Sequence, residues 1–136
     1  MKQRVNGYFL SELLNGLAGM ADDDEMTAKF KTLDVNDASK VKAVIASSLK
    51  PEFETRSSKF QDACRTALSY YLSKSGTRFD RPFYASLLPF DLPNDSRQFF
   101  VWVWEVFFPG QDYRVRDLAD FEEVHDISEP LKIDTR

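Results

Sequence analysis

Apolar residues recur at three- and four-residue steps through much of the chain, the spacing of one face of an α-helix. The first such stripe begins at Val5 and continues to Met20, where Gly16 and Gly19 weaken its last turn. It consists of Val5, Phe9, Leu10, Leu13, Leu14, Leu17 and Met20. We therefore expect an N-terminal helix that ends near Met20.

The same spacing predicts two further helices before residue 50. The acidic run 22–25 is typical of a first helical turn, where carboxylates complement the helix dipole. Its helix would bury Met26, Phe30 and Leu33. Asn36 or Asp37 is a plausible cap for the next helix. That helix would bury Val41, Val44, Ile45 and Leu49.

The clearest helical pattern covers residues 51–75, with Pro51 in its first turn and Ser75-Gly76 at its end. Its apolar face would contain Phe53, Ser57, Phe60, Cys64, Ala67, Leu68 and Tyr71. Residues 77–93 contain three prolines and predict a loop with one short helical turn around 83–88.

Residues 99–108 are apolar except for Glu105, and their pattern fits two structures. Val-Trp-Val-Trp has the composition of a strand. Caps at 94–96 and the stop at Pro109-Gly110 favour a buried helix instead. We predict an all-α fold, a single compact domain of five to six helices around a long central helix. The alternative is an α+β fold with a strand at 99–108.

The C-terminal segment repeats an apolar residue every three positions, at Val115, Leu118, Phe121, Val124 and Ile127. A three-residue step drifts around an α-helix, so only part of this series can share one face. The pattern predicts a short helix over 116–124 and an extended end at 128–130. We accordingly assign 1–125 to a single helical domain and 126–136 to an extended acidic C-terminal tail.

The net charge of −4 belongs to the end of the chain. Residues 1–111 contain as many acids as bases, whereas residues 112–136 contain eight acids and four bases. Residues 51–81 are mildly basic. This balance argues against a general nucleic-acid binder, and the longest apolar run is too short to cross a membrane. The segment 8–17 is interrupted by polar residues, unlike a secretion signal, so we expect a cytoplasmic protein.

The sequence contains no arrangement of residues typical of catalysis, and we predict that the protein is not an enzyme. His125 is the only histidine and Cys64 the only cysteine, and Cys64 falls on an apolar helical face. The acidic run 22–25 lacks the glycine and the terminal glutamate of a calcium loop. The five glycines never cluster as a phosphate loop requires. We expect no metal and no cofactor.

Two features point to the binding of a protein partner. The acidic C-terminal segment interleaves carboxylates with apolar residues, and the chain is rich in the aromatic residues that anchor interfaces. The predicted partner-binding residues are Tyr113, Asp117, Asp120, Phe121, Glu122 and Glu123. The alternative interpretation of this segment is an ordinary amphipathic helix with a solvated face.

We therefore hypothesise a small protein-binding inhibitor, most concretely a bacterial immunity protein. Its acidic face would occlude the basic active-site cleft of a cognate toxin or effector domain. The alternatives are an adaptor or regulatory subunit, including a phage-encoded inhibitor of a host system, and an enzyme with surface carboxylates or a bound metal.

Overall fold

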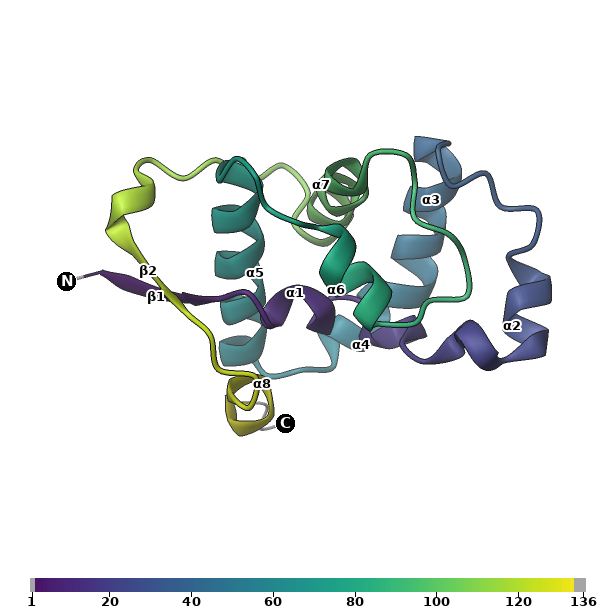
Figure 1. Ribbon diagram of the computed structural model, residues 1–136, viewed down its shortest axis with the longest axis horizontal. Helices are drawn as coiled ribbons and strands as arrows, with labels where there is room; N and C mark the ends of the chain where they lie inside the picture. The colour runs from purple at the N-terminus through teal and green to yellow at the C-terminus, as the bar shows by residue number, and fades with distance from the viewer. Residues whose placement is uncertain (1, 134–136) are drawn as a thin grey trace.

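A computed structural model describes residues 2–133 and shows a mostly helical chain with one two-stranded parallel sheet (Figure 1). In chain order the elements are β1 (Gln3–Asn6), α1 (Phe9–Glu12), the 3-10 turns η1 (Asn15–Leu17) and η2 (Met20–Asp22), α2 (Asp24–Lys29), α3 (Ala38–Val44), the π-helical turn η3 (Ile45–Leu49), α4 (Lys50–Glu54), α5 (Ser58–Ser73), α6 (Asp80–Ala85), α7 (Ser96–Phe107), the 3-10 turn η4 (Leu118–Asp120), β2 (Phe121–Val124) and α8 (Glu129–Ile133). The predicted helical class is confirmed, with the small sheet as an addition.

The prediction of a helix rather than a strand at 99–108 is confirmed by α7. Asp95 caps this helix, and its Oδ1 accepts the N–H groups of Arg97 at 3.0 Å and Gln98 at 3.3 Å. The buried side chains of α7 come from several faces, as expected for a helix inside the molecule: Phe99, Phe100, Trp102, Val103, Trp104 and Phe107. The indole of Trp104 donates to the carbonyl of Gln111 at 2.8 Å, which satisfies its only polar group.

The single helix predicted over 51–75 is wrong, because α4 and α5 are separate. Ser57 was expected on the apolar face, but its hydroxyl instead caps α5 by accepting the N–H of Phe60 at 3.2 Å. The hydroxyl of Thr55 donates to the carbonyl of Glu52 and closes α4. Because these side chains satisfy the backbone at the junction, the chain bends there. One long central helix is not confirmed: the core is shared by α5, of 16 residues, and α7, of 12.

The predicted third helix is present and longer than expected, since α3, η3 and α4 follow one another without a gap. Asp37 caps α3, as predicted, by accepting the N–H of Lys40. The π-helical turn η3 lies directly before α4, which contains Pro51 in its first turn. A proline ring collides with the carbonyl four residues earlier in a regular α-helix, so a wider turn fits this position.

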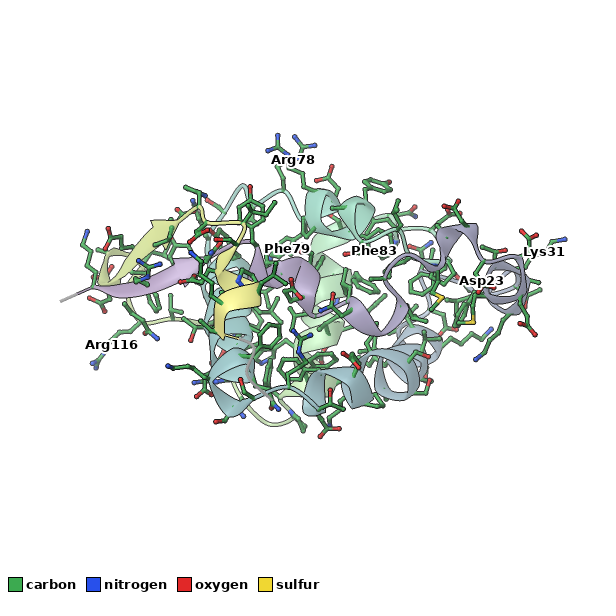
Figure 2. The ribbon with its side chains drawn as sticks, turned by 90° about the horizontal axis from the view of Figure 1, so that it is seen from below. Asp23, Lys31, Arg78, Phe79, Phe83 and Arg116 are labelled. Atoms are coloured by element: carbon green, nitrogen blue, oxygen red, sulfur yellow. The ribbon has the colours of Figure 1, made fainter. Side chains whose placement is uncertain are left out.

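The helices expected around residues 22–33 and 83–88 are both present, as α2 and α6, with shifted bounds. Asp23 caps α2 by accepting the N–H of Met26 at 3.0 Å, and Phe30 is the buried residue of this segment. Phe79, directly before α6, and Phe83, within it, are both buried in the body of the molecule (Figure 2).

The N-terminal helix predicted up to Met20 is wrong, although the apolar stripe that suggested it is almost entirely buried. Residues 3–6 form β1, only Phe9–Glu12 are α-helical, and two 3-10 turns follow. The helix predicted over 116–124 is also wrong, because this stretch contains η4 and β2. β1 and β2 pair in parallel, with Gln3 opposite Phe121 and Asn6 opposite Val124.

The segment 126–133 is not an extended tail. It contains α8, and Asn6 holds its start by donating to the carbonyl of Asp126 at 2.8 Å and to Glu129 at 3.0 Å. Arg4 pairs with Glu129 at 2.8 Å. Residues 134–136 of the predicted tail lie outside the described residues.

The molecule is elongated, and its two ends carry different elements (Figure 1). The β1–β2 pair lies at one end and α2 at the other, with α5, α7 and α3 between them. Within residues 2–133, no helix has the length and apolar character needed to cross a bilayer.

Candidate functional site

The predicted binding residues lie at the β1–β2 end of the molecule, and three of the six are exposed while three are partly buried. Asp117, Asp120 and Glu122 are exposed, and none of their carboxylates forms an ion pair with another residue of the range 2–133. Leu118 lies among them and is 37% exposed. We call these four residues the acidic end surface.

Phe121 and Tyr113 are half-buried and have structural contacts. The ring of Phe121 packs against that of Tyr70, with the centroids 5.2 Å apart. The hydroxyl of Tyr113 accepts from Arg97 at 3.0 Å, and its carbonyl accepts from Ser69 on α5. Both residues therefore attach the C-terminal segment to the helical body. Leu118 is more exposed than either of them.

Glu123 points toward α5 and is enclosed by three donors. It accepts from the hydroxyl of Tyr71 at 2.8 Å, the hydroxyl of Tyr70 at 3.0 Å and the ammonium of Lys74 at 2.6 Å. The hydrogen bond from Lys74 holds the pKa of this carboxyl below its ordinary value, and burial raises the pKa of the Tyr71 hydroxyl. Glu123 thus attaches β2 to α5 and the residue that follows it, and it does not belong to the acidic end surface.

Replacement of Glu123 by glutamine should lower the free energy of unfolding at pH 7 by about 1–3 kcal/mol, the usual worth of hydrogen bonds to a charged group. A carboxyl whose folded pKa is lowered stabilises the fold above its ordinary pKa of 4.5. That contribution disappears as the pH falls through the folded value. Urea denaturation between pH 3 and pH 7 should therefore show a shallower acid dependence for Glu123→Gln than for the unchanged protein.

Glu122→Gln is the matched control, because Glu122 is the exposed neighbour on the same strand. Its free energy of unfolding should change by no more than about 0.5 kcal/mol. Equal effects of the two substitutions at every pH would contradict the role given to Glu123.

Glu123 also borders a cavity of about 440 Å³, which is not predicted from the sequence. The cavity lies between α1, the end of α5, the 76–78 turn, α6 and the end of β2. Its lining includes the charged side chains of Lys74, Arg78, Arg81 and Glu123 and the imidazole of His125. Three of these belong to the mildly basic stretch 51–81. The positive charge of this stretch is the only sign of the cavity in the sequence. The sequence alone does not show that the end of β2 forms one side of it.

The structure does not bring Cys64 and His125 together. Cys64 is fully buried, and its thiol donates to the carbonyl of Phe9, whereas His125 is exposed at the edge of the cavity. The run 22–25 lies at the opposite end of the molecule, at η2 and α2. In residues 2–133 there is no cluster of three or more His, Cys, Asp or Glu side chains able to hold a metal ion.

Comparisons of the chain with protein-family models, with curated proteins and with solved structures found no match. The physical properties of its surfaces are therefore the basis for any statement about function.

Proposed function

We propose that this chain is a small cytoplasmic protein-binding inhibitor, most concretely a bacterial immunity protein that occludes the basic active-site cleft of a cognate toxin. The observation that carries the proposal is the acidic end surface, where three exposed carboxylates without ion-pair partners among the described residues lie within four positions of the exposed Leu118 in the chain. Unpaired carboxylates attract a basic partner, and an apolar residue among them supplies contact area.

The contacts that hold β2 and the segment after it favour binding without a rearrangement of the acidic end surface. The tyrosines and lysine around Glu123 hold β2 from one side, and Asn6 and Arg4 hold the segment that follows it. Asp117 accepts the N–H of Ala119 at 2.9 Å and shapes the turn that presents Leu118. A surface that is already ordered loses less conformational entropy when its partner binds.

A neighbouring gene supplies the first test of this proposal. Because immunity proteins protect the cell that makes the toxin, the product of the adjacent reading frame should stop growth when expressed alone. Growth should return when this chain is co-expressed. An adjacent product without toxicity, or toxicity that persists on co-expression, would count against an inhibitor.

Charge reversal tests the docking surface itself. The triple variant Asp117→Lys, Asp120→Lys and Glu122→Lys should slow association with the partner by about tenfold or more at low salt and flatten the salt dependence of the rate. Stopped-flow or surface-plasmon measurements at several salt concentrations give these rates.

The opposite end of the molecule offers a control with the same change in net charge. Asp22, Asp23 and Glu25 are exposed at η2 and α2, and Asp23 caps α2 as Asp117 caps η4, so each triple variant loses one capping side chain. Reversing these three charges should affect association much less. If both triple variants slow association equally, only the net charge matters, and the acidic end surface is not the docking site.

A further inference from the structure

The cavity beside Glu123 combines an apolar wall with a cationic edge. Leu10, Pro82, Ala85 and the ring of Tyr71 supply its apolar lining. Lys74, Arg78 and Arg81 supply positive charge, and Glu123 is the one carboxylate among its lining residues. A volume of about 440 Å³ falls in the range of small-molecule sites.

The charges of the cavity are unequally neutralised. Lys74 and Glu123 form an ion pair at 2.6 Å, so each compensates the charge of the other, and two tyrosine hydroxyls also donate to Glu123. Arg78 pairs with Asp80 through two contacts, at 2.8 Å and 3.1 Å, and projects from the surface (Figure 2). The backbone N–H of Arg81 donates to the carbonyl of Arg78, but its guanidinium makes no hydrogen bond or ion pair with any residue of the range 2–133, so the side-chain N–H groups remain available.

The cationic side chains at the cavity edge supply its free donors. The hydroxyls of Thr77 and Ser11 do not, because Thr77 donates to the carbonyls of Tyr71 and Lys74 and Ser11 donates to the carbonyl of Tyr8. The guanidinium of Arg81 and the remaining N–H groups of Lys74 and Arg78 lack acceptors. A ligand that satisfies them must carry several acceptor oxygens and negative charge, which a phosphate group provides better than a single carboxylate.

We propose that this cavity is a binding site for a small organic phosphate monoester. The phosphate lies against Arg81 and Lys74 at the edge, and the organic part lies on Leu10, Pro82 and Ala85. This site is independent of the acidic end surface, because none of the residues of that surface lines the cavity.

Phenyl phosphate is a suitable probe, because it joins a dianion to an apolar ring of modest size. Calorimetric titration of the full chain should show saturable binding to one site. Amide NMR shifts should concentrate on Gly76, Thr77, Ala85 and His125, which line the cavity. Inorganic phosphate, phenol and benzoate should each bind more weakly than phenyl phosphate, because each lacks one of the two features.

Ala85 gives the sharpest variant pair, since it is exposed on α6 and lines the cavity. Ala85→Glu places a carboxylate in the wall and should weaken phenyl phosphate binding by about tenfold or more. Ala85→Gln has the same size without the charge, so it separates repulsion from obstruction and should bind at least several times more tightly than Ala85→Glu.

Arg81→Gln should also weaken binding by about tenfold, whereas Arg65→Gln, an exposed position on α5 outside the cavity, should leave it unchanged. The charge-reversed variant of the acidic end surface should retain phenyl phosphate binding, which keeps this result separate from the fate of the inhibitor proposal.

Four results would overturn the proposed site: no binding of phenyl phosphate, equal binding by Arg81→Gln, equal weakening by the two Ala85 variants, or NMR shifts outside the cavity. Inorganic phosphate binding as tightly as phenyl phosphate would refute the role of the apolar wall. Benzoate binding as tightly would refute the assignment to phosphate.

Discussion

Replacement of Phe99 by alanine is expected to lower the free energy of unfolding by about 3–5 kcal/mol, the usual cost of emptying a buried phenylalanine site. Phe99 is fully buried on α7. Its ring lies edge-on to that of Phe83, with centroids 5.2 Å apart, and contacts those of Phe90 and Phe100. Because these rings come from α6, α7 and the loop between them, the cavity left by the mutation has no single neighbour able to fill it.

Urea denaturation monitored by tryptophan fluorescence measures this loss. Tyr84→Ala is the control on the neighbouring helix, since Tyr84 is 62% exposed and its loss should cost about 0.5 kcal/mol or less. A Phe99→Ala variant as stable as Tyr84→Ala would contradict the central place of Phe99 in the core.

The second large effect is expected at Gly16, where the backbones of two segments meet. A Cβ atom at this position would lie 2.0 Å from the carbonyl oxygen of Ser48 and 3.1 Å from the Cα of Leu49. Backbone atoms cannot rotate away as a flexible side chain can. Gly16→Ala should therefore separate η1 from η3 and lower the free energy of unfolding by about 3 kcal/mol or more.

Gly110→Ala distinguishes this steric effect from the ordinary cost of replacing a glycine. Gly110 has a φ of +79° and open space around it, so an alanine there should cost about 1 kcal/mol through backbone strain alone. The two variants should differ clearly in denaturation midpoint. Equal midpoints would show that η1 and η3 do not approach each other so closely.

The sequence was most informative where a helix is defined by nearby residues. For α7, the cap at Asp95 and the stop at Pro109-Gly110 lie within the segment itself, so the helix could be predicted despite its strand-like composition. The cap of α3 at Asp37 was visible for the same reason. The break at Ser57 was missed because a serine on an apolar helical face and a serine that caps a helix look alike in sequence.

Predictions failed where the partner of a segment lies far away along the chain. The stripe from Val5 onward correctly marked buried residues, yet its first part is a strand because β2 pairs with it from residues 121–124. The apolar spacing over 116–124 predicts a helix for the same reason, because the pairing of residues 121–124 with β1 is not visible in it. A residue that must be buried can be buried by either element, and a distant strand decides which one forms.

In the candidate sites, too, local properties could be predicted from the sequence and contacts between distant segments could not. The concentration of acidity in the last residues could be counted from the sequence, and Asp117, Asp120 and Glu122 are exposed. The same pattern places Glu123 with them, although two tyrosines of α5 and Lys74, which directly follows the helix, donate to it. An inward carboxylate on a strand looks identical to its outward neighbour until the packing of the strand is known.

The sequence by itself thus determined most of the apolar residues that are buried, the caps of α3 and α7, and which end of the chain carries the net charge. These properties depend on periodicity, on short-range capping and on composition. Only the tertiary structure decided that β1 pairs with β2, that Glu123 turns inward, and that Arg81 borders one cavity with Leu10 and Glu123. Each of those features joins residues that are distant along the chain, and the packing of the whole molecule selects them.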